Sequence, residues 1–405
     1  MITPARRTAY QVLLRVFEDD AYADRAFRGA AAGLDGRERA FAHRLAYGSV
    51  QRVRTLDHAI ETLGRRPVRK LDPPVRAALR LGAYQLGYTD TAPHAAVNES
   101  VELVRGARLE RAVPFTNAVM RRLTDGIRSL LDALPDGPLK ESYPDWIHET
   151  FVRVLGEDGS LALMRAMNEP LETVVRLVAG EPPSGDEATY VPGAYRVERV
   201  DEALVTAGRI WPQSRGSQLA GLCVDSCDGE RVLDLCAAPG GKTGQLRGEV
   251  TAVEIDPARA RELRENLATM GRADVTVVEA DGTALPAELE GFDRALVDAP
   301  CSGLGVLAQR PDLRWRATPL PDLQLALLRS AAERVRPGGT IVYSVCTLNP
   351  DECEAVIDSS GLRVLPLGEE WPAFAHPSRP DFLLTLPHLH GTTGFFIARL
   401  VRSTG

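Results

Sequence analysis

The sequence predicts a multidomain protein with an all-α N-terminal domain, a small mixed α+β connector and a C-terminal α/β domain. Apolar residues recur at three- and four-residue spacing through the first 130 residues, where strand signals are missing. From Arg231 onward, short Val/Ile/Leu runs alternate with helical segments, which is typical of a parallel sheet covered on both faces. The 405 residues suffice for two or three domains. We place them at 1–130, 141–225 and 226–405, with a Pro/Gly-rich linker over 131–140.

The N-terminal helices have recognisable beginnings. Residues 5–18 carry a helical apolar stripe, and Asp35 with Glu38 has capping-box spacing before the next one. Pro73 and Pro93 are typical first residues of two further helices. We expect one turn of this domain to gather a basic cluster made of Arg52, Arg54, Arg65, Arg66, Arg69 and Lys70.

Charge is divided unequally along the chain. Residues 1–130 contain 22 Lys and Arg against 14 Asp and Glu, a net charge of +8, whereas the whole chain has −7. A basic domain of this kind favours a partner with a phosphate backbone, although a solvated helical surface gives the same count.

Several classes of protein are excluded. No apolar run reaches the roughly 18 residues that a membrane helix needs, and the N-terminus lacks the apolar region of a signal peptide. We therefore expect a cytoplasmic protein without a membrane partner. We also expect the protein to be a monomer. Six cysteines in so long a chain are too few for a disulfide framework. Cys223, Cys227 and Cys236 lack a nearby His, and we expect no metal site.

The connector and the α/β domain carry the strand signals. V-V-R-L-V-A (174–179) is expected to be a strand, but the fold of the remaining connector is left open. Five parallel strands are expected at V-L-D-L-C, V-T-A-V-E-I-D, V-T-V-V-E-A-D, F-D-R-A-L-V-D and T-I-V-Y-S-V-C. The apolar run 394–400 could add a late antiparallel strand.

The carboxyl ends of these strands should meet at one edge, where open α/β sheets bind ligands. The first strand ends in D-L-C-A-A-P-G-G-K-T (234–243), where Gly240 and Gly241 let the backbone approach a ligand closely. Glu254 closes the second strand 20 residues after Asp234, the spacing at which an acidic side chain binds ribose hydroxyls. Asp281 follows the third strand, beside the expected adenine edge.

Three classes of nucleoside site compete for this edge. A P-loop requires glycine where the chain has Cys236, and a dinucleotide site requires more glycines than C-A-A-P-G-G supplies. Without a cradle for phosphates, the pattern favours S-adenosylmethionine, which has a ribose and an adenine but no phosphate.

Two cysteines, Cys301 and Cys346, end the fourth and fifth strands on the same edge. A thiolate that adds to C6 of cytosine makes C5 nucleophilic enough to accept a methyl group. Asp298 is placed to hold a carboxyl group against N3 of the ring and stabilise its developing charge. Spacing alone does not decide which cysteine attacks.

At these residues the chain resembles the bacterial ribosomal RNA cytosine-5 methyltransferases of the RsmB (Sun/Fmu) type over nearly its whole length. The resemblance is carried by D-L-C-A-A-P-G-G-K-T, D-A-P-C-S-G-L-G (298–305) and Y-S-V-C-T (343–347), and by A-P-H-A-A-V-N-E-S-V-E-L-V (92–104), which is similar to a NusB-like RNA-binding domain. It implies a Rossmann-like methyltransferase domain that acts on small-subunit ribosomal RNA. It also implies that Cys346 is the nucleophile, that Cys301 assists release, and that S-adenosylmethionine binds through Cys236, Ala237, Ala238, Pro239, Gly240, Gly241, Lys242, Glu254, Asp281 and Asp298.

The chain departs from the family pattern at three positions. Val345 stands where Thr is usual, Ser214 replaces the Asp of Gln-Asp, and Thr393 replaces the Asp of Asp-Gly. Two alternatives therefore remain: a non-catalytic RNA-binding assembly factor that retains the fold, and a methyltransferase acting on a different acceptor. The segment Q-R-P-D-L-R-W-R (309–316) suits phosphate contacts and base stacking near a flipped nucleotide, or else a surface helix with one buried Trp.

Overall fold

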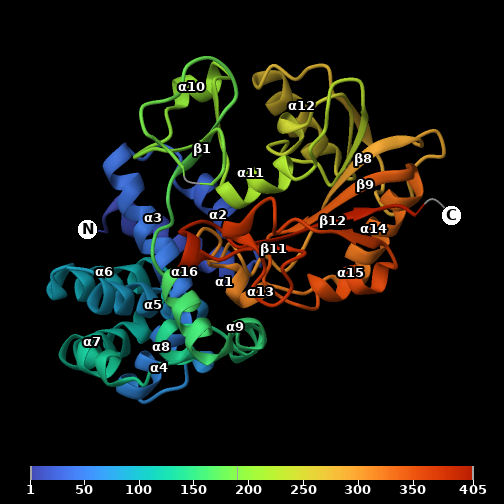
Figure 1. Ribbon diagram of the computed structural model, residues 1–405. Helices are drawn as coiled ribbons and strands as arrows, with labels where there is room; N and C mark the ends of the chain where they lie inside the picture. Colours follow the sequence, from blue (N-terminus) through green and yellow to red (C-terminus); the bar gives the residue numbers. More distant parts are fainter. Residues whose placement is uncertain (1, 189, 404–405) are drawn as a thin grey trace. The chain divides into compact units, whose positions relative to one another are not determined.

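Residues 2–188 and 190–403 are described by the computed structural model, and they divide into two units (Figure 1). The helical unit holds the chain up to Glu149 together with Glu157–Asn168 and Leu307–Arg316. The sheet unit holds Thr150–Gly156, Glu169–Val306 and the chain from Ala317 onward. Among the described residues, no helix has the length and apolar composition that crossing a bilayer requires.

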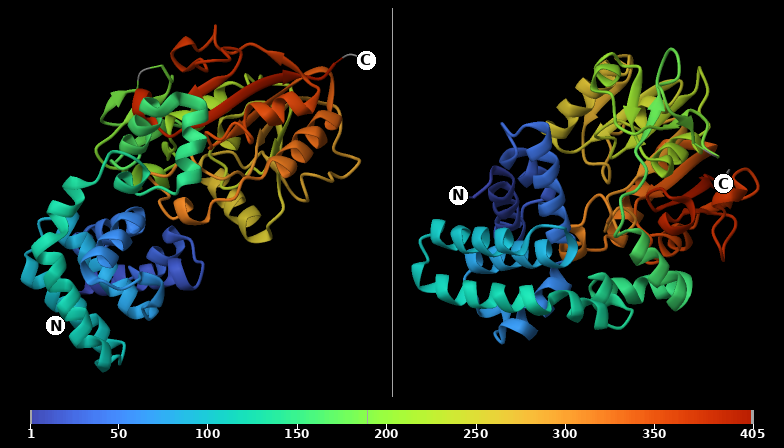
Figure 2. Two further views of the ribbon diagram at one scale, coloured as in Figure 1. Left: turned by 90° about the horizontal axis from the view of Figure 1, so that it is seen from below. Right: turned by 90° about the vertical axis from the view of Figure 1, so that its left-hand side faces the viewer.

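The helical unit confirms the predicted all-α N-terminal fold. Asp35 accepts a hydrogen bond from the backbone N–H of Glu38 at 2.8 Å and so caps α3, and Pro73 and Pro93 begin α5 and α6 as predicted. Helices α6 and α7 lie side by side (Figure 2). The helices are α1 (Pro4–Glu18), α2 (Ala23–Ala30), α3 (Gly36–Gln51), α4 (Val53–Gly64), η1 (Val68–Lys70), α5 (Pro73–Tyr88), α6 (Pro93–Gly106), η2 (Glu110–Ala112), α7 (Val113–Ala133), α8 (Pro138–Glu141) and α9 (Asp145–Ala166). Helix α9 is kinked at Gly156, and its part Thr150–Gly156 belongs to the sheet unit.

The core of the helical unit forms around α5, which packs against α1, α3, α4, α6 and α7. Leu79 and Leu81 of α5 are fully buried. A Cβ atom at Gly48 of α3 would lie 2.0 Å from the hydroxyl oxygen of Tyr84, so a larger residue at this position would displace the Tyr84 ring of α5. The predicted linker at 131–140 forms the end of α7, a turn and the start of α8, all within the helical unit.

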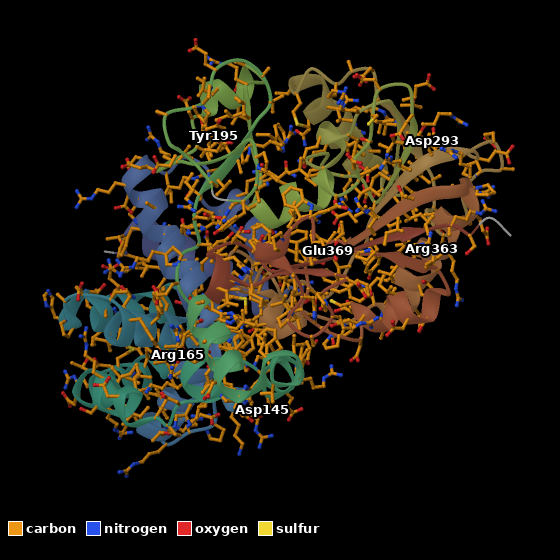
Figure 3. The ribbon with its side chains drawn as sticks, in the orientation of Figure 1. Asp145, Arg165, Tyr195, Asp293, Arg363 and Glu369 are labelled. Carbon is orange, nitrogen blue, oxygen red and sulfur yellow. The ribbon has the colours of Figure 1, made fainter. Side chains whose placement is uncertain are left out.

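The prediction of a single basic cluster is wrong, because α4 separates its members. Arg52 and Arg54 lie at the beginning of α4, where Arg54 donates a 2.8 Å hydrogen bond to Asp145 (labelled in Figure 3). A helix of 12 residues is about 18 Å long. The other four residues are exposed around the turn that follows the helix, and we call them the basic turn: Arg65, Arg66, Arg69 and Lys70.

Segment Leu307–Arg316 belongs to the helical unit and does not present the RNA-contacting side chains considered above. The guanidinium of Arg314 is buried and donates hydrogen bonds to backbone carbonyls at the ends of α3, α8 and α9, those of Gln51, Glu141, Ser142 and Met167. The indole of Trp315 donates to the carbonyl of Val50 at 2.7 Å. These donors already have protein partners, which gives the segment a structural role.

The connector forms a small antiparallel sheet with the strand order β2-β3-β1-β4. Its strands are β1 (Val174–Leu177), β2 (Asp186–Glu187), β3 (Ala194–Arg196) and β4 (Ile210–Pro212), with the short helix α10 (Glu202–Thr206) before β4. The strand predicted at 174–179 is confirmed as β1, which pairs with both β3 and β4. Tyr195 of β3 is labelled in Figure 3.

The main sheet confirms the five predicted parallel strands and the late antiparallel one. Its order is β10-β12-β9-β8-β5-β6-β7, with β11 paired to β12. The strands are β5 (Arg231–Leu235), β6 (Glu249–Glu254), β7 (Thr276–Glu279), β8 (Phe292–Asp298), β9 (Val335–Val345), β10 (Arg363–Leu365), β11 (Leu383–Thr385) and β12 (Phe395–Val401). The accompanying helices are α11 (Arg215–Leu222), η3 (Thr243–Gln245), α12 (Pro257–Thr269), α14 (Pro321–Arg334), α15 (Glu354–Ser360), η4 (Pro372–Phe374) and α16 (Pro387–His390); α13 (Leu313–Arg316) lies in the helical unit.

Candidate active site

The carboxyl ends of the five neighbouring parallel strands carry the predicted site residues, with Asp281 just after β7. The strands β9, β8, β5 and β6 are neighbours in this order, and they end at Val345, Asp298, Leu235 and Glu254. Their ends, and the loops that follow them, therefore lie in succession along one edge of the sheet. The chain runs from β5 to β6 and β7 on one side, then crosses to β8 and β9 on the other. Such a reversal of strand order creates the crevice in which open α/β sheets bind their ligands.

The loop after β5 is held in shape by a buried carboxyl group. Thr243 donates a 2.7 Å hydrogen bond from its hydroxyl to Asp234, which closes the loop 236–242 on its own strand. Burial raises the pKa of Asp234 to about 7. Gly240 has a φ of +104°, and a Cβ there would lie 2.8 Å from Leu263 of α12. The glycine is therefore required by both the backbone conformation and the packing of the loop against α12.

The two carboxylates expected to bind the nucleoside differ in environment. Glu254 is 2% exposed, and its Oε1 accepts a hydrogen bond from the backbone N–H of Asp256. Its buried Oε2 has no hydrogen-bond partner among the described residues but forms an ion pair with the guanidinium of Arg259 at 3.5 Å. A carboxylate oxygen can accept more than one hydrogen bond, so beside Arg259 this atom can still accept one from a ligand hydroxyl. Asp281 is exposed, and hydrogen bonds from the backbone N–H and hydroxyl of Thr283 lower its pKa.

Asp298, the last residue of β8, is held on both carboxylate oxygens. Lys242 lies 2.7 Å from its Oδ2, and Ser344 of β9 donates a 2.7 Å hydrogen bond to Oδ1. The ammonium of Lys242 also lies 4.8 Å from the ring centroid of Phe395. One loop and two neighbouring strands therefore fix the orientation of this carboxylate.

The thiols of Cys301 and Cys346 lie 3.5 Å apart and share a hydrogen bond. This hydrogen bond lowers the pKa of Cys346, against the opposing effects of burial and of the negative charge of Asp298; the positive charge of Lys242 adds to the lowering. The pKa of Cys301 is raised well above its ordinary value by the same interaction and by burial. Of the two thiols, Cys346 is therefore the one that loses its proton more readily, and its thiolate can accept a hydrogen bond from the Cys301 thiol.

Burial is the largest influence on the pKa of three other cysteines. It raises the pKa of Cys236 to about 12 and raises those of Cys223 and Cys353 as well. Buried thiols of this kind are poor nucleophiles at neutral pH. Among the described residues, no group of three His, Cys, Asp or Glu side chains is arranged to hold a metal ion.

Three polar residues of the site were missed by the sequence reasoning. Ser344 lies in Y-S-V-C-T and Thr243 lies in D-L-C-A-A-P-G-G-K-T. Their closeness in sequence to Cys346 and Lys242 was the available signal that their hydroxyls belong to the site. Glu352 lies beyond the motifs, in the loop between β9 and α15, where it has 0% exposure and accepts hydrogen bonds from several segments.

Comparison with known proteins identifies relatives of both halves of the chain. The family model for 16S rRNA methyltransferase RsmB/F matches residues 222–401, and that for the NusB family matches residues 3–125. A Synechocystis sp. protein named "Probable ribosomal RNA small subunit methyltransferase B" is 34% identical over 98% of this chain and 99% of its own. A Thermus thermophilus "Ribosomal RNA small subunit methyltransferase B" is 34% identical, covering 90% of this chain and 89% of its own.

Solved structures show the same fold. The structure titled "Crystal Structure of PH0851" has a TM-score of 0.81 at 23% identity and covers 99% of both chains. A methyltransferase homolog protein from Pyrococcus horikoshii has a TM-score of 0.56 at 27% identity, covering 68% of this chain and 99% of its own.

Proposed function

Because the chain belongs to the RsmB/F family of S-adenosylmethionine-dependent 16S rRNA methyltransferases, we propose that it methylates C5 of a cytosine in small-subunit ribosomal RNA through a covalent adduct with Cys346. The single observation that carries the proposal is the thiol pair Cys301–Cys346 next to the anchored carboxylate of Asp298. The family also confirms the expected fold class, a NusB-like N-terminal domain followed by a Rossmann-like methyltransferase domain with a small connector.

The residues after β5 and β6 fit the cofactor. Bound S-adenosylmethionine would supply an electrophilic methyl group. The loop 236–242 and Asp281 would line its site together with Asp298, and the buried Oε2 of Glu254 would accept a hydrogen bond from a ribose hydroxyl.

In the proposed mechanism, the thiolate of Cys346 forms a bond to C6 of cytosine, and the electron pair moves toward C5, which becomes the nucleophile. Asp298 would hold its carboxyl group against N3 of the ring, where a proton shared between the carboxyl group and N3 offsets the negative charge that develops on the ring. After methylation a base accepts the C5 proton, the electrons of the C5–H bond restore the C5–C6 double bond, and the C6–S bond breaks with its electrons returning to sulfur. Cys301 assists this release by donating its hydrogen bond to the departing thiolate of Cys346.

The helical unit is proposed to bind the RNA. The four residues of the basic turn are exposed, and none of them forms an ion pair with another residue that the structure describes. The guanidinium of Arg66 lies over the ring of Phe115, 5.4 Å from its centroid. Unpaired cations at one turn are suited to phosphate groups, whose contacts provide affinity without sequence specificity.

The test is transfer of a labelled methyl group to 16S rRNA, either naked or in a partly assembled small subunit, followed by bisulfite mapping of the product. We expect Cys346→Ala to lower the rate by more than about 10³-fold, as loss of a nucleophile does. Cys227→Ala, which alters an exposed cysteine, is the matched control. Full activity of Cys346→Ala would contradict the mechanism. Cofactor binding without turnover on any RNA would instead favour a non-catalytic assembly factor.

A further inference from the structure

Glu352 is a fully buried carboxylate that contacts both loops carrying the paired cysteines. It lies six residues after Cys346, between β9 and α15, and has 0% exposed surface. Removing a carboxylate from water costs several kcal/mol unless hydrogen bonds replace the lost hydration. The partners of Glu352 therefore indicate what the residue holds in place.

One oxygen of Glu352 is bound to the Cys301 side of the site. Its Oε1 accepts hydrogen bonds from the backbone N–H of Ser302 at 2.9 Å, from the backbone N–H of Leu320 at 3.1 Å and from the amide of Gln324 at 3.0 Å. Ser302 directly follows Cys301. The same Gln324 amide also donates to the carbonyl of Pro300 at 2.9 Å, so the cysteine is restrained on both sides.

The other oxygen is bound to both loops. Its Oε2 accepts hydrogen bonds from the hydroxyls of Ser302 and Thr347, the second at 3.3 Å, and from the amide of Asn349 at 3.5 Å. The two hydroxyls lie 2.8 Å from each other. Thr347 directly follows Cys346, so a single carboxylate joins the residues that come immediately after the two cysteines.

We propose that Glu352 is a positioning residue for methyl transfer, which sets the distance between the sulfur atoms of Cys301 and Cys346. The proposal rests on the proposed function for its catalytic meaning. Glu352 touches neither sulfur; it acts through Ser302 and Thr347. The two sulfur atoms lie 3.5 Å apart on loops that follow different strands. Without the carboxylate of Glu352, these loops would lose the hydrogen bonds that Ser302 and Thr347 donate to it.

The consequence concerns the protonation of the nucleophile. If the loops separate, the Cys301 thiol no longer donates to the Cys346 thiolate, and the thiolate form loses the interaction that stabilises it. The cytosine also meets a sulfur atom that is displaced from its position of attack. Since the basic turn is unchanged, we expect RNA binding to be retained while the chemical step slows.

The experiment compares Glu352→Gln and Glu352→Ala with the wild-type chain and with Asp351→Asn. Gln keeps the volume of the side chain and one acceptor oxygen but places an NH2 group among hydrogen-bond donors. Asp351 adjoins Glu352, but its exposed carboxylate pairs with Arg153, so its variant is the control. Two quantities are measured: the pH dependence of Cys346 alkylation by iodoacetamide, mapped by mass spectrometry, and kcat with KM for rRNA.

For Glu352→Gln we expect the midpoint of alkylation to move upward by about one pH unit. We expect kcat to fall on the order of 10- to 100-fold, as misplacement of reacting groups does, with KM for RNA nearly unchanged. Asp351→Asn should match the wild type in both. If Glu352→Ala fails to fold, Glu352→Gln alone decides.

An alkylation profile and a kcat of Glu352→Gln equal to those of the wild type would overturn the positioning role. If the wild-type chain transfers no methyl group to RNA, the proposed function fails. The alkylation profiles then still decide about Glu352: an upward shift supports the positioning role, and an unchanged midpoint overturns it.

Discussion

Thr393 donates a hydrogen bond from its hydroxyl to the hydroxyl of Ser214 over 2.7 Å. These are two of the three positions at which the chain departs from the motif pattern of its family, and they lie 179 residues apart in the sequence. Ser214 also caps α11 by accepting a hydrogen bond from the backbone N–H of Ser217. The two departures therefore form one contact, which joins the beginning of α11 to the segment before β12.

This pairing predicts that the two positions are energetically coupled. We expect Ser214→Ala, which removes the cap and the acceptor, to lower the free energy of unfolding by about 1–2 kcal/mol. Thr393→Val removes only the donor and should lower it by about 1 kcal/mol. In urea unfolding, the double variant should lose less than the sum of the two losses. Strict additivity would show that the hydroxyls do not depend on each other.

The thiol pair predicts a pH effect of Cys301→Ala. The reactive thiolate of Cys346 is present above its lowered pKa and is lost as the pH falls below it. Removing the Cys301 hydrogen bond raises that pKa, so the rate of Cys346 alkylation should fall at neutral pH and recover at higher pH.

The same variant tests the release role of Cys301. Without its assistance, the RNA should remain attached to Cys346 and appear as a denaturation-resistant band on a gel. The double variant Cys301→Ala with Cys346→Ala should give no such band. Absence of the band from the single variant, under conditions where RNA is methylated, would exclude a role of Cys301 in release.

The buried guanidinium of Arg314 predicts a large effect on stability. Arg314→Met keeps the apolar volume but leaves several backbone carbonyls of the helical unit without their donor. We expect a loss of about 3–5 kcal/mol, as for other buried charged partners. Arg316→Ala is the control, because its main partner Asp20 is exposed and surface pairs contribute about 0–1 kcal/mol. Thermal and urea unfolding give the free energy of unfolding of both variants. Equal decreases in Arg314→Met and Arg316→Ala would contradict the structural role of Arg314.

The sequence predicted the strands and the ligand-binding edge because both depend on local patterns. Asp234, Glu254, Asp298 and Cys346 end or follow apolar strands, and the parallel order places them along one edge. The 3.5 Å contact between Cys301 and Cys346 could not be predicted, since it depends on how two loops from different strands pack together. The hydrogen bonds that Glu352 accepts there come from three separate segments.

The sequence does not show which basic side chains have partners in the folded protein. Their count per segment predicted a charged domain, but not which side chains have partners. Arg314 and Arg54 are bound by carbonyls and carboxylates distant in sequence, whereas Arg66 and Lys70 are exposed. Charge counts do not distinguish these cases, because the distinction depends on tertiary contacts.

The basic turn predicts a salt-dependent contribution to RNA affinity. Each cation that contacts a phosphate releases a counterion, so losing one contact reduces the slope of log K against log salt by about 0.9. We expect the paired change Arg66→Ala with Lys70→Ala to weaken binding to any RNA sequence and to reduce the slope by up to about 2, with cofactor affinity unchanged. Arg105→Ala is the control, because Arg105 pairs with Glu102 and Glu110 on the same unit. Filter binding at several salt concentrations measures the slope. If the paired variant keeps the wild-type slope and loses no more RNA affinity than Arg105→Ala, the basic turn is excluded as a phosphate contact.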